Sequence, residues 1–589
     1  MDYQLPQRDI TFLLDEVLDL DKTLALPGYE HCDKDTFFAV VDAINGFVRD
    51  NLATCNEAGD SPGARLEDGQ VYAAPGFGDA YKVFCEDGWN ALALEEEFGG
   101  QQLPFVLHAA LREGMAGTNL AFALIHELNF GVVEALMAYG SEEQKAVYCP
   151  QLTSGNWAGT MNLTEPHCGT DLGLIRTKAL RNDDGSYAIT GNKIFITWGD
   201  HDMSENVAHL ILARVEGAQP GPRGLSLFLA PKYMLDVDNN TTDQRNTITI
   251  AGIENKMGIH GSPTCAISFE DTKAWIVGEE GKGLAAMFVM MNAARLSVGL
   301  QGLGVAEAAV QTATAYAHER LQGRADGEPL NPNGPADPLI AHADVRRRLL
   351  TAQGEMDAAR ALAYFGASLL DAAHRAETPE LRKEADTRLS LLTPVIKSYL
   401  SDMGSRMANE AVQMHGGHGF IKDYGVEQLV RDVRITEIYE GTNAVQARDL
   451  VMRKVRGDNG AVIKGLIADM LDEAGKLGPD LSDVETHLRD AATRLGRSTD
   501  WVLGAAQGDV LSGACDYLEI VALSLSAWMS ARIARVATVA SGDQSPDYYA
   551  DRADAARAFM ARALPRAVSH ELIMQAGEPG IVCRADRCL

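Results

Sequence analysis

Two glutamates three residues apart, Glu437 and Glu440, are the side chains whose setting best suits acid–base chemistry. They lie in the segment RITEIYEGTN, residues 434–443, among isoleucine and tyrosine side chains and just before a glycine that interrupts a helical stretch. A carboxylate held at a turn in apolar surroundings is either a helix cap or a reagent, because burial raises its pKa toward the range of a general base. Composition alone does not decide which glutamate would act.

A second candidate segment is LTEPHCGTD, residues 163–171, where a helical pattern gives way to a strand pattern. Thr164, Gly169 and Thr170, with the local main-chain N–H groups, could present donors to an anionic or polar ligand. A plain capping turn explains the same residues equally well when they are taken alone.

Histidines raise the question of a metal site. The pair His201 and His209 and the pair His415 and His418 lack both the H-E-x-x-H spacing and a companion cysteine pair. We therefore expect structural or substrate-lining roles for these histidines, and no metal.

Glycine-rich segments do not provide a nucleotide motif. In GLQGLGVAE, Glu307 occupies the third glycine position of G-x-G-x-x-G, and the surrounding pattern is helical. In GEEGKGLAA, Lys282 is followed by glycine where a phosphate loop has serine or threonine. Close helix packing and a loop leaving the β region are the expected roles.

The composition limits the class of protein. The chain has 589 residues, 52 Lys+Arg against 82 Asp+Glu and a formal net charge of −30. This charge disfavours nucleic acid and anionic lipid as partners. We find no apolar run near the roughly 18–20 residues of a membrane span, and the N-terminus lacks a signal-peptide pattern. Nine scattered cysteines indicate a reducing cytoplasm.

Hydrophobic periodicity predicts an α+β multidomain chain. Apolar residues spaced three and four apart predict helices in residues 1–156, and alternating, β-branched segments predict an antiparallel β domain in residues 157–282. Helical patterns return in residues 283–456, and a further helical block covers residues 457–589. Because no βαβ alternation occurs, a doubly wound dinucleotide fold is not expected.

Taken in order, several segments give a specific resemblance. LTEPHCGTD, ITGNKIFITWG, KMGIHGSPTCAISFEDT, MMNAARLSVGLQGLG, YAHERLQGR, AVQMHGGHGF and RDVRITEIYEGTN all follow the order of the acyl-CoA dehydrogenase family. The chain resembles this family along almost all of residues 1–455. The extra C-terminal helical block resembles the family's larger subgroup.

The resemblance implies an FAD-dependent oxidation of an acyl-CoA thioester to the trans-2-enoyl-CoA. In this family the glutamate before Gly-Thr, here Glu440, removes the α-proton while the β-hydride passes to the flavin. The motif position therefore favours Glu440 over Glu437. Gly441 lets the chain turn, and Thr442 or Asn443 would cap the next helix.

The resemblance also implies the contacts with FAD and substrate. Thr164 would lie near the flavin ring, Thr170 near the pyrophosphate or the substrate, and the Thr197 hydroxyl near flavin N5. Substrate contacts would come from Thr170, Arg295, Glu440 and Gly441. The full set of expected FAD-binding residues is Met161, Leu163, Thr164, Gly169, Thr170, Phe195, Ile196, Thr197, Arg320, Gln322, Gln413, Gly416, Gly417 and Thr442.

Four positions depart from the common family pattern. His167 and Cys168 replace glycine and alanine, Phe195 replaces a frequent tryptophan, and Ala444 replaces a polar residue of the smaller members. These changes leave FAD binding expected but put individual contacts in question. Cys168 is expected to be a small packed residue without a redox role.

Within the family, the sequence is most similar to members that oxidise 3-(methylthio)propanoyl-CoA in dimethylsulfoniopropionate breakdown. The alternatives are a general fatty acyl-CoA dehydrogenase of β-oxidation and, more remotely, a non-catalytic flavin-bearing DNA-response protein. Electron-transferring flavoprotein is the implied electron acceptor. Shared cofactor sites imply a homodimer, and neither nucleic acid nor a membrane is an expected partner.

Overall fold

The computed structural model describes residues 3–327, 329–540 and 545–577. The chain forms two compact units. One unit comprises Met1–Asp42, Pro104–Glu113 and Val298–Leu589, and the other comprises Ala43–Leu103 and Gly114–Ser297. Each unit is described by itself below.

The first part of the chain is helical, as its periodicity predicts. Helix α7 begins with a capping box in which Ser141 and Gln144 satisfy each other's main-chain N–H groups, and it ends at Gly155 with a φ of 77°. A small hairpin, which the sequence did not predict, interrupts the helices. The elements are α1 (Gln7–Thr11), α2 (Leu20–Leu24), α3 (Lys34–Phe47), α4 (Ala53–Asp60), β1 (Arg65–Glu67), β2 (Gln70–Tyr72), α5 (Phe77–Glu86), α6 (Phe105–Tyr139) and α7 (Glu142–Ser154).

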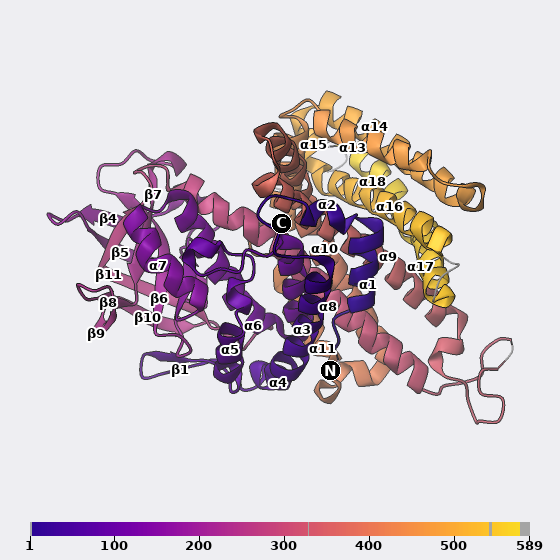
Figure 1. Cartoon of the computed structure of the whole chain (residues 1–589), viewed down its shortest axis with the longest axis horizontal. Coiled ribbons are helices and arrows are strands. Elements are labelled where there is room, and N and C mark those ends of the chain that lie inside the picture. The colour runs from indigo at the N-terminus through magenta and orange to yellow at the C-terminus, as the bar shows by residue number, and fades with distance from the viewer. Residues whose placement is uncertain (1–2, 328, 541–544, 578–589) are drawn as a thin grey trace, which may run out of the picture. The chain divides into compact units, whose positions relative to one another are not determined.

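A seven-stranded sheet follows, with the order β10-β11-β5-β4-β6-β3, while β7 pairs with β11 and β6. Most pairs are antiparallel, as predicted, but β3 and β4 each pair in parallel with β6, so the sheet is mixed. In Figure 1 these strands lie together. The strands are β3 (Trp157–Asn162), β4 (Lys178–Arg181), β5 (Tyr187–Thr197), β6 (Asn206–Val215), β7 (Leu225–Pro231), β10 (Ile248–Ile253) and β11 (Thr264–Val277), and β8 (Tyr233–Leu235) pairs separately with β9 (Thr241–Arg245).

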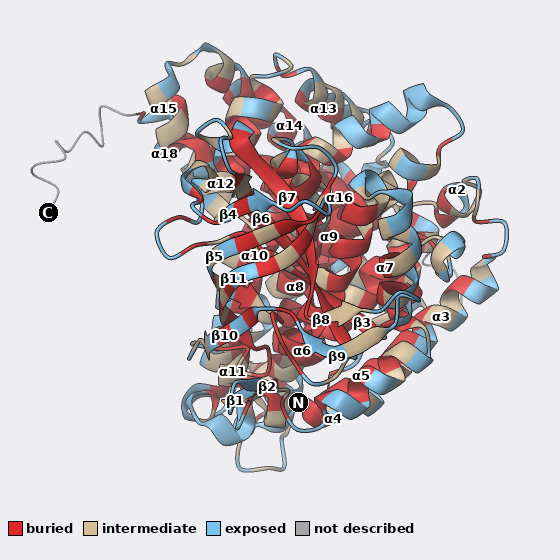
Figure 2. Ribbon diagram, turned by 90° about the vertical axis from the view of Figure 1, so that its left-hand side faces the viewer, coloured by how far each residue is buried: buried red, intermediate tan, exposed pale blue. Residues whose placement is uncertain are grey.

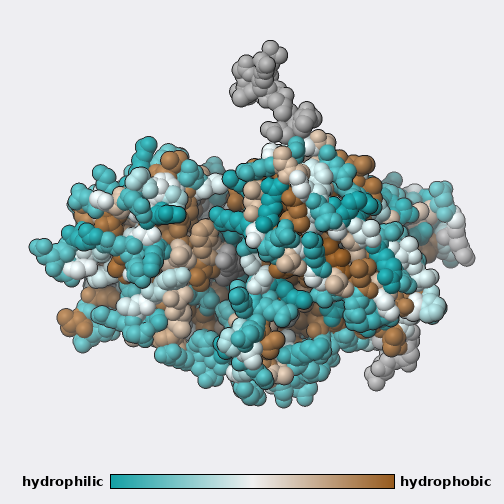
Figure 3. Space-filling model, turned by 90° about the horizontal axis from the view of Figure 1, so that it is seen from above, coloured by the Kyte–Doolittle hydropathy of each residue, from teal (hydrophilic) through white to brown (hydrophobic). Residues whose placement is uncertain are grey.

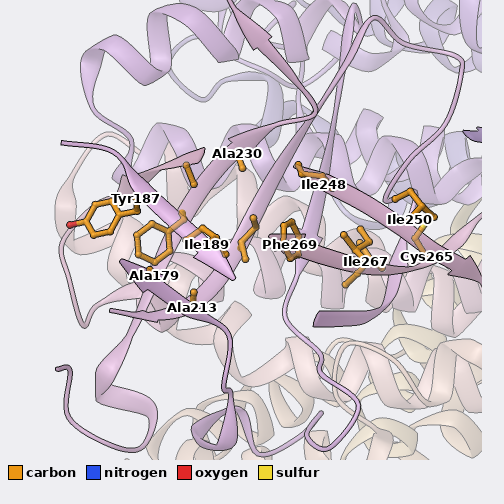
Figure 4. Close-up of a cluster of buried hydrophobic side chains, with 14 of the residues drawn as sticks. Ala179, Tyr187, Ile189, Ala213, Ala230, Ile248, Ile250, Cys265, Ile267 and Phe269 are labelled. Atoms are coloured by element: carbon orange, nitrogen blue, oxygen red, sulfur yellow. The ribbon is translucent and has the colours of Figure 1, made fainter. Parts of the chain in front are cut away.

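One face of this sheet carries the hydrophobic core of the β region (Figure 4). Ile189 and Ile196 of β5 pack with Ile267 and Phe269 of β11 and with Ala213 of β6, and each is at most 2% exposed. Ile267 and Phe269 are two residues apart, as strand alternation requires, whereas Ile189 and Ile196 are seven apart and register shifts lie between them in the pairing with β11. The core therefore fixes the register of β5, whose end carries predicted cofactor residues.

The helices after the sheet pack closely because of glycine. A Cβ atom at Gly302 would lie 2.3 Å from the main-chain oxygen of Leu400, and one at Gly299 would lie 2.7 Å from Ile396. The prediction that GLQGLG serves helix packing is thus confirmed. The helices are α8 (Gly283–Glu319), α9 (Ala343–Arg375), α10 (Pro379–His415), α11 (Val426–Val433) and α12 (Asn443–Asp449).

A buried ion cluster joins α8 and α9 to the first part of α6. Arg360 of α9 is fully buried and donates from Nε to Glu113 at 2.9 Å, and it also pairs with Glu307. Tyr364 donates to Glu113 at 3.0 Å. Glu307, which breaks the glycine motif, is therefore a counter-ion in the helical core.

The last helical block surrounds one central helix. Helix α16 contacts α14, α17, α18 and α9, and Figure 2 shows α9 and α16 largely buried. On the face drawn in Figure 3, hydrophilic side chains predominate and apolar ones form scattered patches. The helices are α13 (Ala461–Ala474), α14 (Ser482–Gly504), α15 (Gln507–Ser512), α16 (Ala514–Ala540), α17 (Pro546–Ala558) and α18 (Arg566–Gln575).

Three described helices are long and apolar enough, by length and composition, to cross a membrane: Phe105–Tyr139, Gly283–Glu319 and Ala514–Val539. The statement that no apolar run approaches a span was therefore wrong. Alanine and branched aliphatic residues make these helices apolar over long windows, and 78%, 62% and 83% of the respective windows are buried inside the chain.

Candidate functional site

The turn that carries Glu440 is strained and well held. Glu440 has a φ of 55° and Gly441 a φ of 85°, both in the left-handed region. For a glutamate this conformation is uncommon and needs support from its surroundings. Gln446 supplies it, because its Nε2 donates to the main-chain oxygens of Glu440 at 3.0 Å and Gly441 at 3.2 Å.

The helix after the turn begins as predicted. Thr442 is the N-cap of α12, and its Oγ1 accepts a hydrogen bond from the N–H of Val445. The side chain of Asn443 is fixed on both sides: its Oδ1 accepts from the Nζ of Lys397 at 2.8 Å, and its Nδ2 donates to Asp402 at 2.8 Å. The half-buried Glu440 therefore sits on a turn with little freedom.

The competing carboxylate, Glu437, is already engaged. Ser405 donates to one of its oxygens and Arg434 forms an ion pair with the other. Glu437 therefore serves as a local structural contact that holds Ser405 and Arg434.

In the β region, a buried ion pair fixes the turn after β3. The Nζ of Lys193, which is fully buried, donates to the main-chain oxygen of Leu163 at 2.8 Å and to Glu165 at 3.0 Å. Glu165 also accepts from the N–H groups of Arg176 and Thr177 and from the Thr177 hydroxyl. Burial lowers the pKa of Lys193 to about 8, although Glu165 opposes the shift.

Hydrogen bonds between β3, β5 and the turn after β3 bring several predicted residues near one another. The turn contains Leu163 and Thr164, and the main-chain oxygen of Thr164 accepts from the N–H of Ile194 on β5 at 3.0 Å. At the end of β5, the main-chain oxygen of Thr197 accepts from the Thr160 hydroxyl on β3 at 2.9 Å. The structure thus places the turn after β3 beside the end of β5.

Phe195 is the most unusual residue of this group. Its φ is 58°, and its side chain is 58% exposed although both strand neighbours face inward or are half-buried. A bulky residue in the left-handed region is an outlier that is found preferentially at functional sites. Met161 is half-buried, Ile196 is buried, and Gly169 and Thr170 are exposed.

The chemistry of this group fits a flavin. The hydroxyls of Thr164, Thr170 and Thr197 form no hydrogen bond within the described part of the chain. Such free hydroxyls can donate to a polar ring edge or a phosphate, and the exposed ring of Phe195 can pack on an aromatic surface. The residues present therefore match an aromatic cofactor that carries phosphate.

The helical unit, which is the compact unit that includes Val298–Leu589, holds a second group of predicted cofactor residues. Tyr316 of α8 stacks on His415 of α10 with ring centroids 4.2 Å apart, and its hydroxyl lies 2.9 Å from Nδ1 of His418. These contacts bring together the ends of α8 and α10. The predicted cofactor residues at these two ends are all exposed: Arg320, Gln322, Gln413, Gly416 and Gly417.

This second group also fits its expected ligand. The side chains of Arg320, Gln322 and Gln413 form no hydrogen bond or ion pair within the described residues. An exposed guanidinium without a carboxylate partner is suited to a phosphate. Arg295, the expected substrate-lining residue, is half-buried on α8.

Among the described residues, the cluster with ligand spacing suited to a metal does not favour one. Ligand atoms of Glu165, His167 and Cys168 lie within 4.8 Å of one another. However, the Glu165 carboxylate already accepts from Lys193 and Thr177, and a bound cation would be repelled by the Lys193 ammonium. His201 and His209 are buried, and burial lowers their pKa values to about 4 and about 3, so both are neutral packed groups.

Sequence reasoning missed the residues that hold the site in place. Lys193 and Glu165 lie inside two of the quoted motifs, but nothing in their spacing indicates that they pair. Gln446 and Asp402 stand outside the motifs on helical segments. Their contacts depend on tertiary packing, which periodicity does not reveal.

Comparison with known families covers nearly the whole chain. Family models match for the acyl-CoA dehydrogenase N-terminal domain at residues 40–156, the middle domain at 160–272 and the C-terminal domain at 281–455. A model described as acetyl-CoA dehydrogenase C-terminal like matches residues 462–582.

Individual proteins and solved structures show the same family relationship. The chain is 39% identical over 553 residues to 3-methylmercaptopropionyl-CoA dehydrogenase of Ruegeria pomeroyi, covering 92% of this chain and 93% of the relative. It is 32% identical over 602 residues to the broad-specificity linear acyl-CoA dehydrogenase FadE5 of Mycobacterium tuberculosis, covering 97% of both. A Bacillus anthracis acyl-CoA dehydrogenase solved with FAD shares the fold, with a TM-score of 0.75 at 20% identity, covering 96% of this chain and 91% of that one. The chain belongs to the acyl-CoA dehydrogenase family and is an FAD-dependent oxidoreductase that acts on an acyl-CoA.

Proposed function

We propose that the protein oxidises 3-(methylthio)propanoyl-CoA to 3-(methylthio)acryloyl-CoA, a step of dimethylsulfoniopropionate breakdown and so of sulfur metabolism. The observation that carries this proposal is the 39% identity, over 92% of the chain, to a relative named for that substrate. The extra C-terminal block is included in this match, so the similarity is not confined to the common catalytic domains.

Glu440 is the proposed base. A thioether acyl-CoA has an α-proton that is only weakly acidic, so the base must be fixed and aimed, as the strained and braced turn allows. Glu440 takes the α-proton on its carboxylate, and the bound FAD supplies the acceptor for the β-hydride. A Cβ atom at Gly441 would lie 2.9 Å from Nε2 of Gln446, so glycine at this position lets Gln446 reach the turn.

The two groups of exposed residues are proposed to hold FAD. The hydroxyls of Thr164 and Thr197 donate to the polar edge of the flavin, and Phe195 covers part of its surface. Arg320 and Gln322, with Gln413 and the exposed glycines at the end of α10, bind the phosphates and adenosine. We assign the adenosine contacts to the neighbouring subunit of a homodimer, as the family pattern implies.

Electron transfer and location complete the proposal. Electron-transferring flavoprotein is the proposed electron acceptor, and the cytoplasm is the proposed location. The scattered cysteines, seven of which are free in the described residues, support a reducing compartment.

A second substrate class has its own support. The relative from Mycobacterium tuberculosis is named for broad specificity toward linear acyl-CoA and matches 97% of this chain. A general fatty acyl-CoA dehydrogenase would share the fold and the base and differ in the acyl pocket. A non-catalytic DNA-response role is disfavoured by the net charge of −30.

Anaerobic bleaching of the flavin tests the proposal. Purified protein is mixed with 3-(methylthio)propanoyl-CoA, butanoyl-CoA, octanoyl-CoA or palmitoyl-CoA, and the absorbance of the oxidised flavin is followed. We expect fast bleaching with the thioether substrate and with butanoyl-CoA. Faster bleaching with octanoyl-CoA or palmitoyl-CoA would instead support the general enzyme, and no bleaching with any substrate would contradict both.

A further inference from the structure

A cavity lined by arginines lies within the helical unit, apart from the predicted cofactor and catalytic residues. Its volume is about 720 Å³, which is within the range of ligand pockets. Its walls come from α8, α9, α10, the segment that joins α17 to α18, and the first residue of α18. None of its lining residues belongs to the set expected to bind FAD or substrate.

The cavity is basic although the protein is acidic. Its lining includes five arginines: Arg347, Arg348, Arg406, Arg562 and Arg566. Glu355 and Glu410 are the lining carboxylates, and Asp344 pairs with two of the arginines from just outside. Glu519 also lies near Arg406 and Arg566, so four carboxylates stand against five guanidinium groups and leave a surplus of one positive charge.

The innermost charged groups of the cavity are held by short hydrogen bonds to Glu355. Glu355 is 3% exposed and accepts from Arg406, Arg566 and Tyr399 at 2.6, 2.6 and 2.9 Å. Burial opposes ionisation of Glu355, but the two guanidinium groups outweigh it and hold its pKa at about 2. Glu355 therefore anchors two arginines, and Glu519 lies near both of their guanidinium groups.

At the outer part, Arg562 has no internal counter-ion. Its side chain is exposed and forms no hydrogen bond or ion pair within the described part of the chain. Arg348 is different, because it pairs with Glu410 at 2.6 Å and with Asp344 at 2.8 Å. Arg562 is thus the guanidinium most available to an anion.

The remaining wall is mainly aliphatic. Alanine and methionine side chains predominate in it, namely Ala309, Ala313, Met407, Met414 and Ala563, with Thr351, Ser405 and Asn409 as the uncharged polar residues, and none of the described lining residues is aromatic. Methionine adapts to irregular apolar ligands, whereas a nucleotide base would call for an aromatic stacking partner. The wall suits a flexible hydrocarbon chain better than a planar ring.

We propose that this cavity binds an amphiphilic anion, namely an aliphatic chain that ends in a carboxylate. The guanidinium groups bind the carboxylate through charge-assisted hydrogen bonds, and the alanine and methionine side chains pack on the chain. The site lies between two matched family domains. Helices α8, α9 and α10 of the acyl-CoA dehydrogenase C-terminal domain supply one side, and Arg562 and Arg566 of the extra C-terminal block supply the other.

Binding of octanoate to the FAD-loaded, full-length protein tests the proposal. Isothermal titration calorimetry at low salt compares octanoate with octan-1-ol, which has the chain without the charge, and with inorganic phosphate, which has charge without the chain. We expect saturable octanoate binding at one site per chain, and at least tenfold weaker binding of the other two. The flavin absorbance should not change, since a ligand beside the flavin would perturb it.

Variants locate the site. Arg562→Gln should weaken octanoate binding about tenfold, because one charge-assisted contact is lost and the residue has no internal partner to disturb. Ala352→Phe, on the half-buried wall of α9, should also weaken it by filling the cavity. Arg489→Gln, which removes the same charge from the exposed surface of α14, is the matched control and should bind like the wild type.

Other outcomes overturn the proposal. If the wild type shows no saturable binding, or if both cavity variants bind octanoate normally, the cavity is not the site. If octan-1-ol binds as tightly as octanoate, the arginines do not bind the carboxylate. If phosphate binds as tightly as octanoate, the aliphatic wall does not contribute to binding.

Discussion

Gln446 donates from Nε2 to the main-chain oxygen of Glu440 at 3.0 Å, so the helix that follows the catalytic turn also holds that turn in its left-handed conformation. Gln446 is 1% exposed and makes a second bond to Gly441. The position of the proposed base therefore depends on a side chain six residues away.

Replacing Gln446 by leucine tests this dependence. Two main-chain oxygens would lose their donor, which typically costs about 1–3 kcal/mol of stability for buried groups. We expect kcat to fall at least tenfold with a smaller change in KM and with flavin content unchanged, as measured by steady-state kinetics and flavin absorbance. An unchanged kcat would show that the turn does not need this support.

The Lys193–Glu165 pair should be required for cofactor retention. Lys193→Met leaves the Glu165 carboxylate buried without its counter-ion, and breaking such a pair typically costs about 3–5 kcal/mol. We expect a lower unfolding temperature and purification with much less FAD. Lys178→Met, at an exposed position of β4, is the control and should retain both properties. Full FAD content in the Lys193 variant would contradict the role given to this pair.

Asp402 should make stability depend on pH. Burial, together with Glu519 and Glu437, raises the pKa of Asp402 to about 7. The folded protein then binds more protons at Asp402 than the unfolded chain does between pH about 4 and 7, so the free energy of unfolding falls as pH rises through this window. The unfavourable contribution above pH 7 is up to roughly 4 kcal/mol.

Asp402→Asn removes this contribution and keeps an oxygen that can accept from Asn443. We expect denaturant unfolding to show the variant more stable than the wild type at pH 8, with little difference at pH 4. Asp490→Asn, at an exposed position of α14, should follow the wild type. The Asp402 assignment fails if both variants show the same pH dependence.

Glycine packing gives a matched pair of substitutions. In Gly302→Ala the new Cβ would lie 2.3 Å from the main-chain oxygen of Leu400, so α8 and α10 must separate, and overpacking typically costs about 1–3 kcal/mol or more. Gly465→Ala on α13 meets no atom within 4 Å and should stabilise the protein by about 0.5–1 kcal/mol. Chemical denaturation measures both, and a neutral Gly302→Ala would contradict the close approach.

The sequence predicts those features of the site that depend on local chemistry. The cap at Thr442, the turn at Gly441 and the packing glycine Gly302 follow from residue type and helical period, and the structure confirms all three. The Lys193–Glu165 pair and the brace from Gln446 depend on contacts between distant segments, which local patterns do not encode. The parallel pairing of β3 and β4 with β6 is missed for the same reason.

The most direct test of the central claim compares Glu440→Gln with the wild type in one anaerobic stopped-flow experiment with 3-(methylthio)propanoyl-CoA. General bases typically contribute about 10²–10⁴-fold, so we expect the variant to bind FAD normally and to bleach at least 100-fold more slowly. Glu437→Gln should bleach at close to the wild-type rate, since Glu437 pairs with Arg434. Normal bleaching by Glu440→Gln, with loss in Glu437→Gln, would contradict the assignment of the base.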